Sequence, residues 1–384
     1  MAEARVRAPR DLRLDFFRGC ALVFIFIDHI PDNALSTVTL RSFAFADAAE
    51  VFIFISGYTA ALVYGRAMLR EGRLMGSVRI LRRVWQLYLA HLVLFMLYNA
   101  QVIYTMQHFN NPLFADELRV GEYLDNSYEA FLNAVLLRFQ PSLLNILPLY
   151  VAMLLAFPLF LIAIARNALL ALVPSGLLYV AVQVWHINLP GYPEDTEWFF
   201  DPFAWQFLFV IAAVFGFAEA SGRRMLPRGG MVGGGITVAA AAMAMAGVVV
   251  MGLDMLHDNF GWPREWNVPL ELVDKTFLPP LRLGSMLALA WLVSRFVGRD
   301  AGFLTSLAAW PVILCGRNSL EIFCLTILLS VLCATVLTVA GHGLATQLVV
   351  NAAGIGVMFA IGLAMAWYDG GGRLPDRAPA GGGA

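Results

Sequence analysis

The sequence predicts an all-α polytopic membrane protein with about ten transmembrane helices. Of its 384 residues, 60% are hydrophobic and only 14% are charged, whereas soluble domains carry about 25% charged residues. The mean hydropathy of +0.71 therefore indicates a surface that faces mostly lipid. A net charge of −1 gives no reason to expect a nucleic-acid partner.

Apolar runs long enough to cross a bilayer as helices, about 20 residues each, number about ten. The runs are continuous rather than alternating, which is typical of helices and not of a membrane barrel. The expected spans are 14–31, 43–65, 83–106, 143–165, 168–185, 203–220, 231–254, 278–297, 308–339 and 345–367. The stretch 308–339 is overlong for one span, so we expect it to be broken or tilted.

The distribution of basic residues orients these spans. With ten spans, 18 of the 26 Lys and Arg residues fall on the side of the N-terminus and six on the other side, while Arg18 and Arg317 lie within spans. Cytoplasmic segments are enriched in Lys and Arg, so both termini are expected in the cytoplasm. The chain then divides into a basic cytoplasmic segment 1–13, a single transmembrane domain 14–368 and a glycine-rich, disordered cytoplasmic tail 369–384.

The sequence shows no motif for disulfide, metal, nucleotide or serine-nucleophile chemistry. The four cysteines all lie in apolar runs and are interpreted as small buried hydrophobes rather than a disulfide framework. No zinc spacing, nucleotide-binding loop or nucleophile elbow is present in the sequence. We therefore expect neither a metal nor a bound cofactor. Glycines 233–235 and the alanine-rich stretch 239–246 suit close helix packing, either within the chain or in a homo-oligomer.

The first span carries the clearest functional signal. Arg18 and His29 are eleven residues apart, which places them about 20° apart around a helix and about 16 Å apart along it. Charged side chains within a span are costly, by about 2.5–3.5 kcal/mol each, so partners or water are expected. Asp15 is spaced to pair with Arg18. The alternative interpretation is that Arg18 reaches the membrane interface and that His29 caps the outer end of the helix.

The second span runs antiparallel to the first, and its acidic residues are expected at the depth of His29 in the membrane. Asp47, Glu50, Phe54 and Gly57 fall on a single helical face, and the span continues through Ser56-Gly57-Tyr58. Glu50 is a candidate to accept the second ring N–H of His29, with Asp28 as a candidate from another direction. The alternative is a salt bridge from Glu50 to Arg41 or Arg282. Ser56-Gly57 is equally typical of a close helix contact.

Polar residues also gather in the outer loops and at the start of later spans. Loops 107–142, 186–202 and 255–277 mix acids, amides and aromatic residues, a composition that suits sugars and also suits any membrane interface. Three polar motifs stand out: Asp201 to Gln206, Asp274 to Arg282 and Gly316 to Glu321. No internal repeat is evident, which disfavours transporter folds built by duplication.

These residues resemble a known family. Arg18 and His29 with ten residues between them, and Glu50 to Tyr58 ending in Ser-Gly-aromatic, are similar to the signature of the membrane acyltransferase-three superfamily. Within it, five segments in order resemble the OpgC family, which adds succinyl groups to osmoregulated periplasmic glucans, over about residues 11–370. They are Leu14 to Gly19, Asp28-His29, Pro202 to Gln206, Lys275 to Leu283 and Gly316 to Phe323. Ser285 and Asn318 stand where relatives are expected to have histidines.

The resemblance implies a transmembrane O-acyltransferase with an acyltransferase-three-like bundle in the bacterial inner membrane. It would move a succinyl group from cytoplasmic succinyl-CoA, a co-substrate, to hydroxyls of a periplasmic glucan, with membrane lipid around it. Three roles are implied for residues of this sequence. The catalytic group would be His29 with Glu50 and Asp28. The residues that would bind acyl-CoA are Arg18, Arg79, Arg82, Arg83, Arg282 and Lys275. The residues that would contact the acceptor glycan or the oxyanion are Trp205, Gln206, Asn318 and Ser56.

Two alternatives remain open. One is a transporter or flippase for a glycan or lipid-linked precursor, with Arg18 and His29 as a proton-coupled gate. The other is the same reaction with acetyl-CoA as the donor or with another surface polysaccharide as the acceptor.

Overall fold

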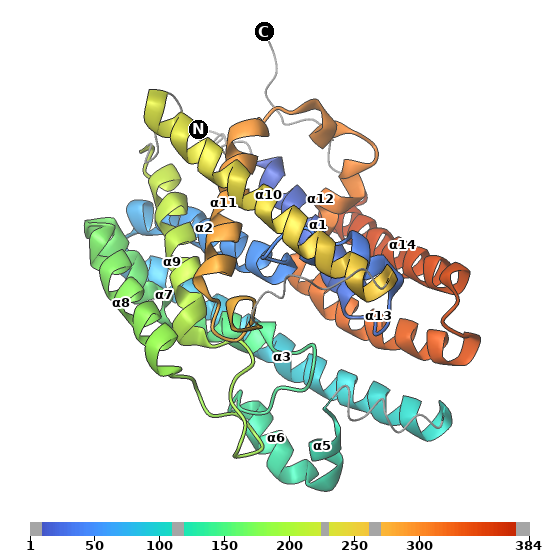
Figure 1. Cartoon of the computed structure of the whole chain (residues 1–384). Helices are drawn as coiled ribbons and strands as arrows, with labels where there is room; N and C mark the ends of the chain where they lie inside the picture. The colour runs from blue at the N-terminus through green and yellow to red at the C-terminus, as the bar shows by residue number, and fades with distance from the viewer. Residues whose placement is uncertain (1–9, 110–118, 224–229, 261–269, 374–384) are drawn as a thin grey trace.

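The described part of the chain is helical. The computed structural model describes residues 10–109, 119–223, 230–260 and 270–373 (Figure 1), and the only β-type pairing in these residues is an isolated bridge between Pro190 and Glu197. Seven helices are long and apolar enough to cross a membrane: α2 (Ala48–Glu71), α3 (Arg73–Phe109), α7 (Ile146–Arg166), α9 (Pro202–Ala220), α10 (Gly230–Phe260), α13 (Ser319–Ala340) and α14 (Leu344–Asp369). The prediction of an all-α multi-pass membrane protein is confirmed at this level.

The remaining elements are shorter. Three helices of 17 residues occupy the other expected spans: α1 (Leu12–Asp28), α8 (Leu169–Trp185) and α11 (Pro280–Phe296). The short helices are α5 (Gly121–Asp125), α6 (Ser127–Val135) and α12 (Ala309–Arg317), with 3-10 turns η1 (Ala34–Val38), η2 (Leu40–Ser42), η3 (Leu270–Leu272) and η4 (Gly302–Thr305). A span count of ten stays a prediction.

Two expected boundaries can be compared directly with the structure. The stretch 308–339 is broken, as expected: α12 ends at Arg317 and α13 begins at Ser319. Helices α2 and α3 extend beyond the expected spans 43–65 and 83–106 and are separated only by Gly72, whose φ of 92° suits glycine. Residues 1–9 of the N-terminal segment and 374–384 of the tail lie outside the described residues.

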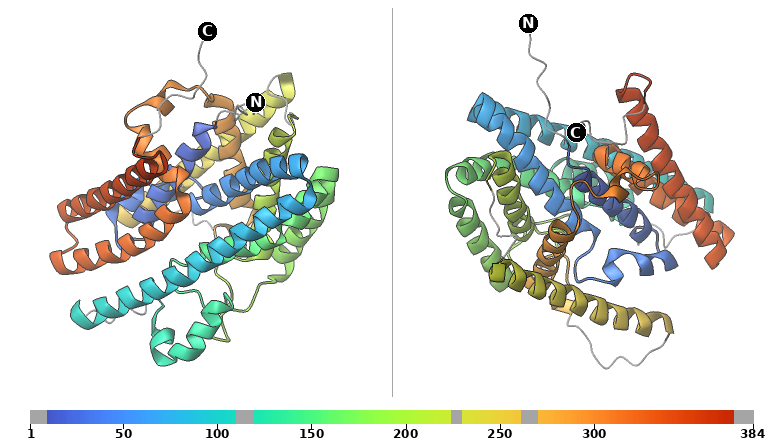
Figure 2. Two further views of the ribbon diagram at one scale, coloured as in Figure 1. Left: turned by 180° about the vertical axis from the view of Figure 1, so that it is seen from behind. Right: turned by 90° about the horizontal axis from the view of Figure 1, so that it is seen from above.

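The helices form two groups around α1 and α2. Helix α1 packs on α2 and α12, and α2 packs on α9. Figure 1 places α7, α8 and α9 on one side and α12, α13 and α14 on the other, and Figure 2 shows α10 lying along the outside of the bundle. Helix α10 is held to α11 by a hydrogen bond from the indole of Trp291 to the hydroxyl of Thr237, at 3.0 Å.

Glycines set the closest helix crossings. A Cβ on Gly216 of α9 would lie 2.0 Å from the carbonyl oxygen of Tyr58 in α2, and one on Gly316 of α12 would lie 1.8 Å from the carbonyl oxygen of Asp15 in α1. Gly57 and Gly19 make the reciprocal approaches. Backbones therefore touch at both crossings, and the Ser-Gly step of α2 is a helix contact.

Two ends of the bundle can be defined. Leu12 near the start of α1 and Ala366 near the end of α14 belong to one apolar cluster with Trp310, so both ends of the described chain lie together, at what we call the Arg10 end. At the opposite, His29 end, α1 finishes while α2, α9 and α11 begin. Tyr150, near the start of α7, contacts Phe52 near the start of α2 at 6.4 Å between ring centroids, so α7 begins there too.

Candidate functional site

A charged cluster lies at the His29 end. Arg282, at the first turn of α11, donates from Nε to Oε1 of Glu50 at 2.6 Å and from Nη2 to Oδ2 of Asp47 at 3.2 Å. All three are buried, and Glu50 is fully so. Lys275 also pairs with Asp47, but its side chain is 39% exposed. The cluster joins α2 to α11 and leaves one cation open to the surroundings.

Local sequence explains how the two acids are placed. Asp47 caps α2 by accepting a hydrogen bond from the Ala49 amide at 2.8 Å, and Glu50 reaches back to the Asp47 amide at 2.9 Å. This is a capping box, and the helix N-terminus favours negative charge. The second carboxylate oxygen of each residue is left to bind the cations.

The segment that carries Lys275 is held by its backbone. Four consecutive carbonyl oxygens, those of residues 275–278, accept hydrogen bonds from Trp205 Nε1, the Asp201 amide, Gln183 Nε2 and the Tyr179 hydroxyl, at 2.9, 3.0, 2.7 and 2.8 Å. Leu278 has a φ of 46°, a conformation that costs a non-glycine residue about 1–2 kcal/mol. These four bonds offset that cost and position both Lys275 and Arg282.

His29 lies at the end of α1 beside this cluster. Its backbone amide donates to the Ile25 carbonyl at 3.0 Å, and its side chain is half-buried, with Nδ1 buried and without a hydrogen-bond partner among the described residues. Lys275 and Asp47 are the charged groups that act on it electrostatically. Asp28 accepts a hydrogen bond from the Thr39 hydroxyl at 2.8 Å.

The carboxylate of Glu50 is occupied by Arg282 and the Asp47 amide. Of the two expectations for Glu50, the structure shows the salt bridge to Arg282. Among the described residues, no hydrogen bond joins Glu50 to His29. Glu50 orients Arg282 and the start of α2. Its role toward the His29 ring stays a prediction.

Arg18 faces α2 from the other half of α1. Its Nη2 donates to the Thr59 hydroxyl at 2.7 Å and to the Ile55 carbonyl at 3.3 Å, while its buried Nε has no partner among the described residues. Asp15 binds Arg10 and Arg317 instead, at 2.5 and 3.6 Å. Thr59 had no signal in the sequence, since a single hydroxyl in an apolar helix is common.

The predicted basic face lies on the first turns of α3. Arg79 and Arg82 are exposed and Arg83 is half-exposed. Arg79 forms an ion pair with Glu71 at 2.6 Å, and Arg83 donates to Gln86 at 3.4 Å. This face lies near the α2–α3 junction, at the Arg10 end.

The expected glycan-contacting residues are mostly enclosed. Trp205 is fully buried and its indole N–H is bound to the Lys275 carbonyl. Gln206 is buried, accepts from the Ser175 hydroxyl at 2.5 Å and donates to the Ser175 carbonyl at 3.0 Å. Ser56 is buried at the α2–α9 contact, and Asn318 binds the Leu314 carbonyl at the α12–α13 break. Trp205 and Gln206 therefore position the Lys275 segment and α8, and neither offers a free face or donor to a sugar.

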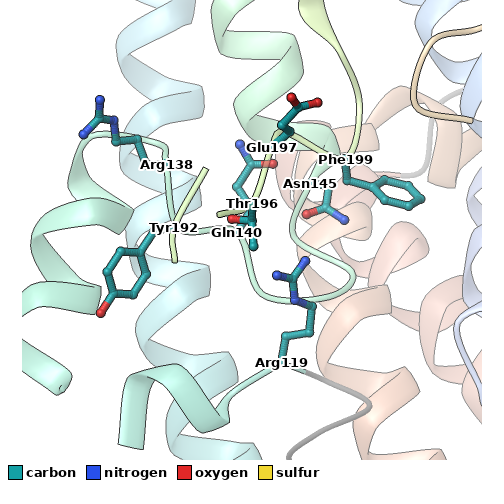
Figure 3. Close-up of a pocket in the computed structure, with 8 residues that line it drawn as sticks. All are labelled: Arg119, Arg138, Gln140, Asn145, Tyr192, Thr196, Glu197 and Phe199. Atoms are coloured by element: carbon teal, nitrogen blue, oxygen red, sulfur yellow. The ribbon is translucent and has the colours of Figure 1, made fainter. Parts of the chain in front are cut away.

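A separate polar recess lies among the loops of the His29 end. It is lined mainly by Arg119, Arg138, Gln140, Asn145, Thr196 and Glu197, with Tyr192 and Phe199 (Figure 3). Tyr192, Thr196, Glu197 and Phe199 belong to the outer loop 186–202, whose composition suits sugars. Arg119, Arg138 and Gln140 belong to the outer loop 107–142 of the same character, whereas Asn145 had no signal because it was expected within the span 143–165.

Together, the apolar helices and the buried cluster of ionisable residues beside His29 define a multi-pass membrane protein with a polar site at one end of its bundle. The family model described as "OpgC protein" matches residues 10–370. The chain therefore belongs to the OpgC family, and the expected membership is confirmed. This membership indicates an acyltransferase-type protein that modifies a glucan. No curated protein and no solved structure matches the chain.

Proposed function

We propose that the protein is a transmembrane O-acyltransferase that moves a succinyl group from cytoplasmic succinyl-CoA to a hydroxyl of a periplasmic glucan. The observation that carries the proposal is the buried ionic cluster of Asp47, Glu50 and Arg282, with the exposed Lys275, beside a histidine whose Nδ1 has no partner among the described residues. A neutral imidazole can take a proton, and an accessible cation can bind the carboxylate of the acyl group.

His29 is the general base in this proposal. It takes the proton from a glucan hydroxyl, the hydroxyl oxygen attacks the thioester carbon, and the C–S bond breaks as the sulfur of CoA leaves and receives that proton from the His29 imidazolium. The products are a glucan ester and CoA. Asp28 is the remaining candidate to orient the ring, since Glu50 binds Arg282.

The donor enters from the Arg10 end. Arg79, Arg82 and Arg83 bind the phosphates of CoA there, and the pantetheine arm passes Arg18 toward His29. Eleven residues of helix separate these two side chains by about 16 Å, a span that an extended arm can cover. No resident cofactor takes part.

This function requires a defined topology. We propose ten spans within a single acyltransferase domain, 14–368, a cytoplasmic segment 1–13 and tail 369–384, and insertion in the bacterial inner membrane. The clustering of Leu12, Trp310 and Ala366 supports placing both ends of the domain on one side. Membrane lipid surrounds the bundle, and a homo-oligomer is compatible with the open face of α10 at Gly234 and Gly235.

The test is transfer in proteoliposomes. Labelled succinyl-CoA and a glucan are supplied to wild type, His29→Ala and His342→Ala, the last altering an exposed histidine in the α13–α14 loop. We expect wild type and His342→Ala to label the glucan, and His29→Ala to lose at least about 100-fold in rate, as removal of a general base does. If wild type transfers no acyl group but makes the vesicles permeable to glucan, the enzyme proposal fails.

A further inference from the structure

The polar recess at the His29 end is built from three separate segments. Arg119 precedes α5, Gln140 and Asn145 lie between α6 and α7, and Thr196 and Glu197 belong to the loop between α8 and α9. In Figure 3, Arg119, Gln140, Asn145 and Thr196 gather around one space. The enclosed part of the recess has room for about one water-sized group, so it suits a single hydroxyl group of a ligand and not a whole sugar ring.

Two amide oxygens in the recess lack hydrogen bonds. Gln140 is 8% exposed, and its Nε2 donates to the Leu137 carbonyl at 2.8 Å, which leaves Oε1 without a partner among the described residues. Oδ1 of Asn145 is also buried, and none of the residues that the structure describes donates a hydrogen bond to it. A buried acceptor without a donor costs about 1–3 kcal/mol. Both oxygens therefore call for a ligand that donates hydrogen bonds.

The surrounding groups narrow the class of that ligand. Arg119 supplies donors and Glu197 supplies an acceptor, so a group that both donates and accepts, such as a hydroxyl, is satisfied in the recess. A phosphate or carboxylate could pair with Arg119 and Arg138, but it would leave the two amide oxygens without a donor and would meet Glu197. Phe199 is 43% exposed at the rim and offers an apolar face to the C–H side of a sugar ring.

A backbone hydrogen bond connects the segment that lines the recess to the segment that carries Lys275. Phe199 is two residues before Asp201, whose amide donates to the Thr276 carbonyl at 3.0 Å, and Thr276 follows Lys275. The segment that carries Phe199 is therefore tied through Asp201 to the segment that carries Lys275.

We propose that this recess is a subsite for a neutral glycan, which holds acceptor residues other than the one that is acylated. The inference rests on the proposed transferase function for its role, but the binding itself does not require transfer. Gln140 and Asn145 are binding residues in it, and they take no part in the chemistry at His29.

The test separates binding from transfer. Binding of a labelled glucan oligosaccharide to the full chain in nanodiscs, without acyl-CoA, is compared for wild type, Gln140→Leu, Asn145→Leu and the control Asn133→Leu on α6. Leucine keeps the approximate volume and removes the acceptor. We expect Kd for the oligosaccharide to rise about tenfold or more in the first two variants, with Asn133→Leu unchanged and with wild-type thermal stability in all. In transfer assays, KM for glucan rises and KM for the acyl-CoA and kcat stay the same.

The outcomes distinguish the two proposals. If the folded Gln140 and Asn145 variants keep the wild-type Kd and KM for glucan, the subsite is wrong, whether or not transfer occurs. The same conclusion follows if inorganic phosphate displaces the oligosaccharide, since this would show an anion site. If wild type binds glucan in a Gln140-dependent manner and transfers nothing, the subsite stands and the transferase proposal fails.

Discussion

The two cations of the charged cluster differ in burial. The cluster consists of Asp47, Glu50, Arg282 and Lys275. Arg282 is 6% exposed and bound by two acids, so it is already neutralised inside the protein. Breaking such a buried pair by removing one partner typically costs about 3–5 kcal/mol, which assigns Arg282 and Glu50 to the joint between α2 and α11. Lys275 also pairs with Asp47, but its side chain is 39% exposed, and we propose that it is the cation that meets a substrate.

This division leads to a prediction for donor choice. Lys275→Ala removes a charge-assisted hydrogen bond to the succinyl carboxylate, worth about 1.5–3 kcal/mol. We expect KM for succinyl-CoA to rise about 10- to 100-fold, whereas KM for acetyl-CoA, which lacks the carboxylate, stays at the wild-type value. Initial rates with both donors in one preparation provide the measurement and its control. Equal effects on the two donors would remove Lys275 from donor recognition.

Asp201 leads to a prediction for pH. It is fully buried at the start of α9, one carboxylate oxygen has no partner among the described residues, and burial raises the pKa of this carboxyl to about 7, against about 3.9 in an unfolded chain. Between these values the folded state binds more protons, so the free energy of unfolding falls as pH rises from about 4 to about 7.

Asp201→Asn keeps the helix cap and cannot ionise. A pKa difference of about three units corresponds to about 4 kcal/mol, so at about 2–4 °C per kcal/mol we expect its Tm to exceed that of wild type at pH 8 by about 10 °C, and the difference to vanish near pH 4. Thermal unfolding in detergent from pH 4 to pH 8 measures this. Parallel Tm curves for the two proteins would contradict it.

At the helix crossings, packing leaves no room for a side chain. Because Gly216 of α9 touches the backbone of α2, even a methyl group must push two helices apart. Overpacking of this kind costs about 1–3 kcal/mol. Gly356 of α14 provides the contrast, since nothing lies within 4 Å of its Cβ position.

The matched pair Gly216→Ala and Gly356→Ala tests this packing. We expect Gly216→Ala to lower the free energy of unfolding by about 2 kcal/mol. Gly356→Ala should raise it by up to about 1 kcal/mol, because alanine favours helix. Unfolding in detergent with denaturant measures both. A Gly216→Ala protein as stable as wild type would mean that α2 and α9 do not cross so closely.

The elements could be predicted from the sequence better than the contacts between them. Hydropathy located the helices, and the Gly316 to Ser319 step indicated the break between α12 and α13. The three-residue spacing of Asp47 and Glu50 is that of the capping box seen in the structure. The choice of Arg282 as the partner of Glu50 depends on the approach of α11, more than 200 residues later, and no local pattern contains that information. The burial of Trp205 and Gln206 likewise depends on α8 and the Lys275 segment.

The bundle has two chemically different ends. Basic residues of α3 and both ends of the described chain lie at the Arg10 end, and the ionic cluster and the recess lie at the other. A transferase that uses a cytoplasmic donor and an external acceptor needs this separation.

The proposed orientation can be tested with reporters. A reporter joined after the final residue should be active only in the cytoplasm, and one inserted beside Glu194, in the exposed loop between α8 and α9, should be active only outside it. The expectation follows from the excess of basic residues on the side of the N-terminus. The proposed topology places an odd number of spans between the two reporters. If both reporters are active in the same compartment, that number is even and the proposed topology is wrong.

The four bound carbonyls of residues 275–278 have a consequence for how such a site can change. A loop whose backbone is fixed by neighbouring helices cannot accept insertions or a new path without losing several hydrogen bonds at once. Under the donor role that we propose for Lys275, new donor preferences would therefore arise by exchanging the side chain at position 275. Redesign of the enzyme for other acyl groups should begin with a small library at that single codon, with the rest of the segment left intact.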